Sequence, residues 1–307
     1  MPICERDPWR LQFFEKAACP ANVLIPTDDG DCWDWYPEQR WIYDKLKIAQ
    51  TQGIRSGLHD APPKTFPVFS KPNINLKGMG IEGKAIFSHS DFETFSKPGH
   101  MWMELFDGEH ISTDCAIVNG QVKWCRHATG LSWHEGMFKH WVIHAKPILQ
   151  LEYFLNAWIV ENMANYTGMM NFETINGHII ETHLRFADQW CDLYGPNWVQ
   201  ALVGLYTNDI WELETLSDVE GYSVPLFSRH GGPFRFPTKT AQSKIRALPF
   251  IKSLQVTFHE LQADELHAMP PGGFRLGIIN CTNLEAGLAA RKELAACFPN
   301  ADIMIPD

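Results

Sequence analysis

The sequence predicts an α+β protein, on three observations. Strand-forming runs between residues 101 and 126 follow one another closely and are divided by Asp107-Gly108 and Asn119-Gly120, two signals of antiparallel turns. A second pair of strand-forming runs flanks Asn176-Gly177. Between these groups, an apolar stripe over residues 147–165 predicts a helix. Groups of strands separated from helices are typical of α+β folds rather than of regularly alternating α/β folds.

The bulk composition is that of a globular protein, and it limits the partners. The chain has 307 residues, of which 45% are hydrophobic and 20% are charged, so it can bury a large core. Its net charge of −10 and its pI of about 5.7 argue against nucleic acid or an anionic membrane as the main partner. No apolar run approaches the roughly 20 residues of a membrane span, and the N-terminus lacks the apolar core of a signal peptide.

The eight cysteines are scattered along the chain without a Cys-x-x-Cys pair. A chain of this length does not need disulfides to stabilise its core. We therefore interpret the cysteines as reduced thiols and expect a cytoplasmic protein.

The run from Tyr166 to Phe186 carries an unusual set of charges. Glu173, Glu181, His183 and Arg185 sit among Met, Phe and Ile in segments that favour strands. Charged residues in such strands either face water or hold a partner. Carboxylates and an imidazole suit a divalent cation, and a guanidinium suits an anion. The alternative is the solvent-facing polar edge of an ordinary sheet.

Whether these side chains converge depends on the turn between the two strands. A two-residue turn at Asn176-Gly177 would pair Glu173 with Ile180 and would place the two glutamates on opposite faces. A three-residue loop would instead pair Glu173 with Ile179, and both glutamates and His183 would share one face. We expect the three-residue loop.

A second polar group precedes the first strands of the meander. Lys71 closes a strand-forming run, and Gly78 and Gly80 lie in the loop that follows it. A lysine on a strand beside a glycine loop can hold phosphates, because bare backbone N–H groups approach an anion closely. A hairpin with a surface lysine would give the same pattern. Downstream, Glu104 and His110 interrupt apolar runs, which predicts a polar pocket or an exposed face.

The other elements are predicted from caps, turns and periodicity. Helices are expected from Asp34 to about Gly53, over residues 197–213 and over residues 284–298. Strands are expected over residues 219–227, 253–258 and 274–279. Residues 127–146, rich in His and Trp, are expected to form a long loop.

In this order, the motifs resemble those of the ATP-grasp superfamily. Val68-Phe-Ser-Lys-Pro72 and Gly78-Met-Gly-Ile81 look like its phosphate-gripping strand and lid loop. The segment from Met103 to Gly108 resembles the linker strand that reads adenine. Ile180-Glu-Thr-His-Leu-Arg185 is similar to the Glu-x-Asn-x-Arg signature of the carboxylate–amine ligases.

Two further features refine the resemblance. The spacing from Gly168 to Glu173 looks most like that of the L-amino acid ligase branch. Residues 274–279 and the Ala-rich helix after them resemble a C-terminal lobe shared with biotin carboxylase-like members. Together the motifs cover residues 35–300.

The resemblance implies an ATP-grasp fold, in which two α+β lobes grip a nucleotide. It divides the chain into a shortened N-terminal segment (residues 1–43), a nucleotide- and metal-binding core (residues 44–204) and a β-rich C-terminal lobe (residues 205–307). ATP and Mg²⁺ or Mn²⁺ are the implied cofactors. The implied reaction joins a small-molecule carboxylate, such as an amino acid, to an amine or a thiol, with ADP and phosphate as products. A homodimer is an expected assembly, because related ligases often form one.

The resemblance also assigns roles to single residues. Nucleotide binding falls to Lys45, Lys71, Gly78, Gly80, Glu104, Phe106 and His110. The metal ion falls to Glu173, Glu181 and His183, and catalysis to Arg185 and Lys71. Arg185 would bind the acyl carboxylate or the acyl-phosphate and would stabilise the charge of the transferring group.

Two departures from the family pattern motivate alternatives. His183 stands where the family usually has Asn, and only about 40 residues precede Asp44, fewer than the usual N-terminal domain needs. The first alternative is a nucleotide-binding relative without ligase activity, which acts as a binding or regulatory protein. The second is a modifier of a protein terminus or side chain, which differs from the ligase only in its acceptor.

Overall fold

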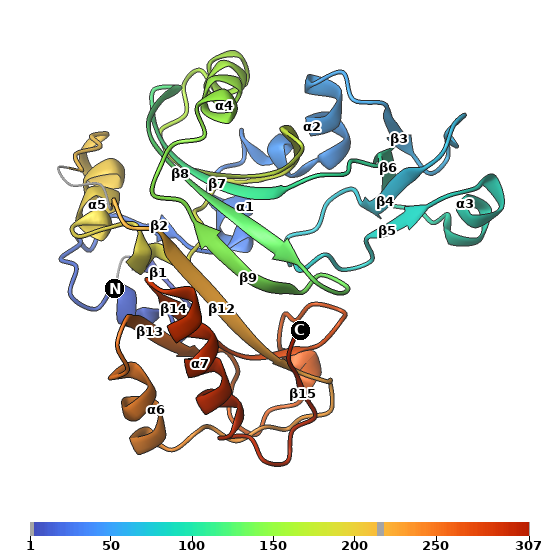
Figure 1. The fold of residues 1–307 in the computed structure, drawn as a ribbon. Helices are drawn as coiled ribbons and strands as arrows, with labels where there is room; N and C mark the ends of the chain where they lie inside the picture. Colours follow the sequence, from blue (N-terminus) through green and yellow to red (C-terminus); the bar gives the residue numbers. More distant parts are fainter. Residues whose placement is uncertain (1–2, 214–217, 307) are drawn as a thin grey trace.

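The computed structural model describes residues 3–213 and 218–306, and in Figure 1 two larger bodies of sheet and helix lie one above the other. A nine-stranded sheet runs through both bodies in the order β11-β10-β7-β8-β9-β12-β14-β13, with β15 beside β12. Its neighbouring strands pair antiparallel throughout. The strands are β7 (His110–Val118), β8 (Gln121–Ser132), β9 (Phe138–Ile143), β10 (Gly168–Ile175), β11 (His178–His183), β12 (Gly221–Ser228), β13 (Ile251–Val256), β14 (Phe274–Cys281) and β15 (Ile303–Met304).

A separate four-stranded sheet, in the order β3-β6-β4-β5, projects from the upper body. Its strands are β3 (Ser56–Leu58), β4 (Val68–Pro72), β5 (Lys84–Ile86) and β6 (His100–Glu104). Near the N-terminus, β1 (Ile3–Cys4) and β2 (Ile25–Pro26) form a short parallel pair. The antiparallel strand groups confirm the α+β class expected from the sequence.

The helices lie on the faces of these sheets. They are α1 (Asp29–Trp35), α2 (Lys45–Thr51), α3 (His89–Phe95), α4 (Leu149–Asn162), α5 (Trp198–Asn208), α6 (Lys239–Arg246) and α7 (Leu284–Ala295). One side of α4 packs on the large sheet through Leu155 and Trp158, which join a core cluster with Phe172 of β10. In the lower body, α6 and α7 cover β13 and β14, and their core includes Leu294 and Phe274. No helix among the described residues is long and apolar enough to cross a membrane.

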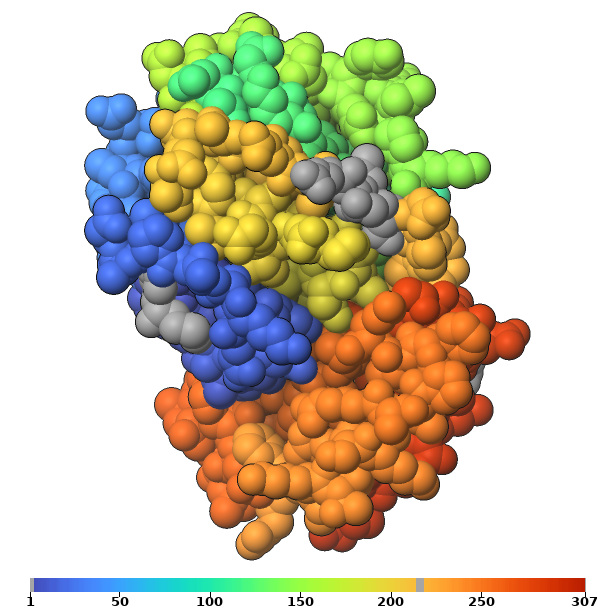
Figure 2. Space-filling view, turned by 90° about the vertical axis from the view of Figure 1, so that its left-hand side faces the viewer, coloured from blue at the N-terminus to red at the C-terminus, as the bar shows by residue number. Residues whose placement is uncertain are grey.

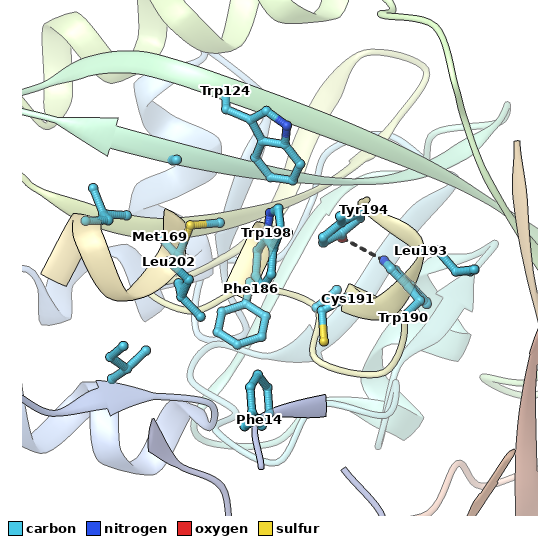
Figure 3. Packing of buried hydrophobic residues seen from close by; sticks show 14 of the residues in the cluster. Phe14, Trp124, Met169, Phe186, Trp190, Cys191, Leu193, Tyr194, Trp198 and Leu202 are labelled. Carbon is cyan, nitrogen blue, oxygen red and sulfur yellow. Dashed lines mark hydrogen bonds between the residues drawn. The ribbon is translucent and has the colours of Figure 1, made fainter. Parts of the chain in front are cut away.

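Large aromatic side chains fill the core where the N-terminal segment meets the upper body (Figure 3). Phe14 packs edge-on against Phe186, which in turn packs against Trp198 of α5. All three side chains are buried. Figure 2 shows the N-terminal segment (blue) against both the yellow part of the upper body and the orange C-terminal part. The segment is therefore part of the packed molecule and brings its polar residues close to the end of β11.

Two expectations about the chain are wrong. Residues 127–146 form the end of β8 and all of β9 instead of a long loop. One of the histidines, His127, is buried and forms hydrogen bonds with Thr113 (2.9 Å) and Glu152 (3.0 Å). A polar residue in this segment therefore does not mean that the segment is an exposed loop. The helix expected from Asp34 is interrupted, because α1 ends at Trp35 and a new helix starts after Asp44.

The hairpin of β10 and β11 differs from the expected loop but gives the expected face. Ile175 pairs with His178, so the turn has two residues, Asn176 and Gly177, both with positive φ. An extra residue, which the three-residue loop would have placed in the turn, lies instead within β11. Thr174 pairs with Ile179 while Glu173 pairs with Glu181, which leaves Ile180 as a bulge. Side chains alternate between the two faces of a strand, and the one-residue bulge shifts this alternation by one position. Glu173 and Glu181 therefore stand opposite each other on one face.

Candidate active site

The bulge at Ile180 is also where the two predicted phosphate-binding lysines meet the hairpin. Lys71, at the end of β4, donates a hydrogen bond from Nζ to the carbonyl oxygen of Ile180 at 2.7 Å. Lys45, at the start of α2, lies with Nζ 3.0 Å from Oε1 of Glu181. Both lysine side chains are buried. The two lysines therefore converge on one stretch of β11, although they come from distant parts of the sequence.

Burial also changes the acidity of Lys71. Removal from water lowers the pKa of its ammonium group to about 8, and the attraction of Glu181 only partly opposes this shift. A buried lysine that can lose its proton near neutral pH is a site where a polyanion would be favoured, because a phosphate would hold the charged form.

Glu173 has a different partner from Glu181. Its Oε2 lies 3.2 Å from Nε2 of His110, the first residue of β7, which is beside β10 in the sheet. Burial raises the pKa of Glu173, but the hydrogen bond and the charge of His110, with further help from His183 and Arg185, lower it to a net value of about 2. Glu173 is therefore a carboxylate at any ordinary pH.

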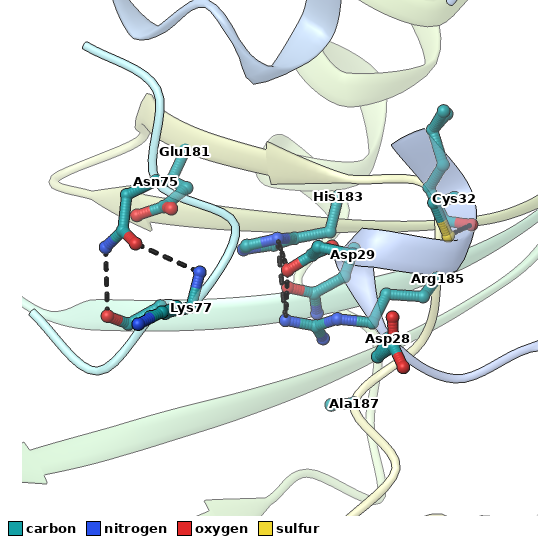
Figure 4. A network of polar contacts seen from close by, with 12 residues as sticks. Asp28, Asp29, Cys32, Asn75, Lys77, Glu181, His183, Arg185 and Ala187 are labelled. Atoms are coloured by element: carbon teal, nitrogen blue, oxygen red, sulfur yellow. Dashed lines mark hydrogen bonds and ion pairs between the residues drawn. The ribbon is translucent and has the colours of Figure 1, made fainter. Parts of the chain in front are cut away.

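His183 and Arg185 meet a carboxylate that the sequence did not single out. Oδ2 of Asp29, at the start of α1, lies 2.9 Å from Nδ1 of His183 and 3.1 Å from Nη2 of Arg185. Its Oδ1 accepts a hydrogen bond from the Tyr43 hydroxyl at 3.2 Å. Figure 4 shows Asp29, His183 and Arg185 pointing toward one another.

This cluster is buried and strongly charged. Asp29 and His183 are almost fully buried, whereas Arg185 keeps a fifth of its side chain exposed. Burial raises the pKa of Asp29, but Arg185 and His183 outweigh it and hold the pKa far below its usual range. Burial likewise lowers the pKa of Arg185, and the opposing attraction of Asp29 and Asp188 leaves it above its ordinary value. Arg185 is thus a permanent cation whose partner in this structure is a residue of its own chain.

The aspartate of the strand before the hairpin has a structural role. Asp114 of β7 accepts hydrogen bonds from Asn171 (2.7 Å), from the backbone N–H of Ala187 (2.9 Å) and from the Tyr194 hydroxyl (2.6 Å). Burial raises its pKa to about 6 despite these bonds. Asp114 fixes the chain just after Arg185 and so helps to position that guanidinium.

The glycine loop after β4 lies against the turn between β8 and β9. Gly78, Met79 and Gly80 all have positive φ near +63°. A Cβ on Gly136, in the opposite turn, would approach the carbonyl oxygen of Met79 to 2.9 Å. Asn75 closes the loop on itself by donating to the carbonyl oxygen of Gly78 at 3.0 Å. The loop is therefore held in close contact with the turn between β8 and β9.

The other residues that were predicted to bind the nucleotide lie where β6 passes into β7. Glu104 ends β6 with its side chain exposed, and Phe106 follows in the connection. The Phe106 ring stacks on His178 of β11 with 4.3 Å between ring centroids and 15° between planes. His110 is the residue already bound to Glu173. Phe106 and His110 thus contact the hairpin of β10 and β11, whereas Glu104 is exposed at the end of β6.

The predicted metal ligands are close in the sheet but have separate partners. Among the described residues, no three His, Cys, Asp or Glu side chains gather closely enough to hold a metal ion. Glu173 and Glu181 face the same side at paired positions, and carboxylate oxygens are the donors that Mg²⁺ prefers. His183 directs Nδ1 to Asp29 instead. The donor set therefore fits a hard cation through the two glutamates.

Sequence reasoning missed Asp29 and assigned Tyr43 no role in the site. The run Thr27-Asp-Asp-Gly-Asp31 has the composition of a turn, and Asp28 caps α1 by accepting a hydrogen bond from the Asp31 N–H at 2.8 Å. Nothing in such a run distinguishes the aspartate that pairs with a distant arginine from the neighbouring Asp28 and Asp31. The only available signal was that His183 and Arg185 needed a negative partner.

Several solved structures with the ATP-grasp fold are similar to this chain. An L-amino acid ligase from Bacillus licheniformis is similar with a TM-score of 0.65 at 12% identity, over 97% of this chain and 84% of the ligase. Phosphoribosylamine–glycine ligase from Thermotoga maritima is similar with a TM-score of 0.60 at 14% identity, over 95% of this chain and 87% of that protein.

A third similar structure was solved with a nucleotide. The biotin carboxylase domain of 2-oxoglutarate carboxylase from Hydrogenobacter thermophilus, in complex with MgADP, ADP and bicarbonate, has a TM-score of 0.52 at 11% identity, over 86% of this chain and 67% of that domain. No family model matches the sequence, and no curated protein matches it either. The chain therefore has the ATP-grasp fold, as the order of its motifs predicted.

Proposed function

We propose that the protein is an ATP-dependent ligase that activates a carboxylate as an acyl-phosphate and joins it to an amine or a thiol. The observation that carries this proposal is the convergence of Lys45 and Lys71 on β11 beside Glu173 and Glu181. Two cations and two carboxylates at the junction of two sheets are the parts that phosphoryl transfer requires, because the enzyme mainly positions groups and neutralises charge. The fold shared with carboxylate–amine ligases supports the same class of reaction.

In this proposal, each residue acts on one part of ATP. Lys45 and Lys71 hold phosphate oxygens, and the loop with Gly78 and Gly80 covers the transferring phosphate. Glu104 and Phe106 lie along the adenine side, and His110 lies near the ribose. The water-excluding loop would protect an acyl-phosphate from hydrolysis.

Glu173 and Glu181 would hold a divalent cation, which neutralises charge on the β- and γ-phosphates when bound. We take the cation to be Mg²⁺, since a structure of the same fold was solved with MgADP. Mn²⁺, the alternative that an imidazole ligand would favour, has less support, because the Nδ1 atom of His183 faces Asp29. The proposed substrates are small carboxylates and amines such as amino acids, and the proposed location is the cytoplasm.

Phosphate release from ATP tests the proposal. Purified protein with Mg²⁺, ATP and a panel of amino acids should release phosphate only when a carboxylate and an amine are both present. Glu181→Gln should abolish the release, because the amide cannot bind the cation as a carboxylate does. The exposed Glu285→Gln serves as the matched control and should leave it unchanged. Unchanged turnover in Glu181→Gln would contradict the metal assignment.

One observation favours the second candidate, a nucleotide-binding protein without ligase activity. Arg185, the residue expected to bind the acyl group, is held by Asp29. If ATP raises the melting temperature but no substrate combination releases phosphate, the binding function is the better description.

A further inference from the structure

Two cysteines stand directly opposite each other in the large sheet. Cys115 of β7 pairs with Cys125 of β8 in the antiparallel register, and their Sγ atoms lie 3.1 Å apart. Both are free thiols in this structure. Residues that face each other in this way have Cα atoms about 4.5 or 5.5 Å apart, and a disulfide can span either separation. The two thiols can therefore be joined without a change of strand register.

The two cysteines differ in how far they are shielded from water. Both lie on the face of the sheet that helix α4 covers: Cys115 belongs to the core cluster that contains Leu155 of α4, and Cys125 packs against the same cluster. Cys115 is fully buried, whereas Cys125 is only partly buried. The pair therefore combines a protected thiol with one that keeps some contact with solvent.

Burial also separates the chemistry of the two thiols. It raises the pKa of Cys115 well above the ordinary value, and the neighbouring thiol of Cys125 raises it further. The thiolate is the form of cysteine that attacks a disulfide. Cys125 is therefore the thiol that reacts first with a dissolved oxidant, and Cys115 is the thiol that completes the reaction.

A disulfide-bonded small molecule such as glutathione disulfide can serve as the oxidant. The Cys125 thiolate attacks one sulfur of this molecule, breaks its S–S bond and releases one glutathione. The Cys115 sulfur, 3.1 Å away, then displaces the second glutathione from Cys125 and forms the bond between the two cysteines. The protein thiols lose two electrons and two protons, and glutathione disulfide takes them up to become two glutathione thiols. A dithiol reductant reverses the sequence.

The bond would cross-link β7 and β8 directly behind the candidate active site. Asp114 and Arg126 form the next pair along the same two strands, and their side chains face the opposite side of the sheet, because successive residues of a strand alternate. Asp114 accepts a hydrogen bond from the backbone N–H of Ala187 and so helps to position Arg185. The disulfide would therefore constrain a strand on which the position of Arg185 depends.

We propose that Cys115 and Cys125 form a redox site, at which a small-molecule disulfide reversibly converts the two thiols into an intrachain disulfide between β7 and β8. The proposal goes beyond the proposed ligase function and does not depend on it. The two thiols are the resting state in a reducing compartment, and the disulfide forms when the oxidant accumulates.

Peptide mapping after treatment with glutathione disulfide tests the proposal. The folded protein is treated, its remaining thiols are blocked with iodoacetamide, and it is digested with trypsin under denaturing conditions without a reductant. Trypsin cuts after Lys123, between the two cysteines, so their two peptides stay together only if a disulfide joins them. The wild type should give these peptides linked, and dithiothreitol should release them.

Single substitutions test the order of the two steps. Cys125→Ser should leave Cys115 as an unmodified thiol, because burial protects it from the oxidant. Cys115→Ala should accumulate glutathione on Cys125, since the thiol that would displace it is absent. Cys297→Ser, at another partly buried cysteine, is the control and should link Cys115 to Cys125 as the wild type does.

The wild type alone decides whether the site exists, so a variant that fails to fold does not protect the proposal. Alkylation of both cysteines after treatment would overturn it, as would glutathione retained on Cys125 or a link from either cysteine to a different one. Glutathione on Cys115 in Cys125→Ser would overturn the order of the steps. Phosphate release has no part in these outcomes, so failure of the redox site is distinguishable from failure of the ligase.

Discussion

Asp29 and Arg185 form a buried ion pair, with 3.1 Å between Oδ2 and Nη2, although they lie 156 positions apart in the sequence. The pair joins the first turn of α1 to the segment that follows β11. His183 shares the same carboxylate oxygen. The short N-terminal segment therefore contributes directly to the predicted catalytic region, because it supplies the carboxylate that accepts a hydrogen bond from Arg185.

Removal of this anion should destabilise the protein strongly. In Asp29→Ala, Arg185 and His183 lose their partner, and breaking a buried pair from one side typically costs about 3–5 kcal/mol. Urea unfolding should show a loss of about that size. The exposed Asp34→Ala in the same helix is the control, with an expected change of about 0.5 kcal/mol or less. Equal losses in the two variants would argue that the pair contributes nothing specific.

The affinity for ATP should depend on pH through Lys71. Its pKa in the folded protein is lowered to about 8, so the ammonium form that binds phosphate is present below that pH and is lost as the pH rises. Above pH 8, binding must take up a proton, and the Kd for ATP should rise by up to about tenfold per pH unit. Lys71→Arg should give a flat profile, because a guanidinium stays charged.

Calorimetric titration of ATP between neutral pH and pH 10, in two buffers with different ionisation enthalpies, measures both the Kd and the number of protons taken up on binding. Proton uptake should appear with the wild type and disappear with Lys71→Arg. Parallel profiles for the two proteins would mean that Lys71 does not hold the nucleotide.

The parts of the site that could be predicted are those in which sequence and local structure agree. Glu173 and Glu181 were recognisable because carboxylates in an apolar strand need a reason to be there. Lys71 was recognisable because it ends a strand before a glycine loop. The shared face of the hairpin was also predicted, although by a three-residue loop, whereas the structure has a two-residue turn and a bulge at Ile180. Both devices add one residue and so have the same effect on parity.

The parts that could not be predicted depend on distant contacts. Asp29 sits in a run of turn residues, and only the folded chain shows that it is buried against Arg185. Residues 127–146 looked like a loop because histidines and tryptophans break a simple alternation, yet His127 and Trp141 are buried in strands. Tertiary partners decided both cases, and a local pattern contains no record of them.

Lys45 and Glu181 should be energetically coupled. Their ion pair is 3.0 Å long and both side chains are largely shielded from water. Lys45→Met and Glu181→Leu should each destabilise the protein by about 3 kcal/mol, because each leaves one buried charge without its partner. The double variant should be more stable than the sum of the single losses predicts, with a coupling energy of about 1–3 kcal/mol. Urea unfolding of the four proteins measures this cycle, and strictly additive losses would show that the two charges act independently.

The contact between the glycine loop and the β8–β9 turn can be tested at Gly136. Gly136→Ala would place a Cβ 2.9 Å from the carbonyl oxygen of Met79, in a residue with a φ of +80°. Gly53→Ala is a close control, because Gly53 has a φ of +69° but no atom within 4 Å of the added Cβ. Both variants should lose about 1 kcal/mol of folding stability because of the strained backbone.

Only Gly136→Ala should also push the glycine loop away. Trypsin should then cleave after the exposed Lys77 faster in Gly136→Ala than in the wild type or in Gly53→Ala, and the Kd for ATP should rise only in Gly136→Ala. Equal cleavage rates in the two variants would mean that the turn does not hold the loop in place.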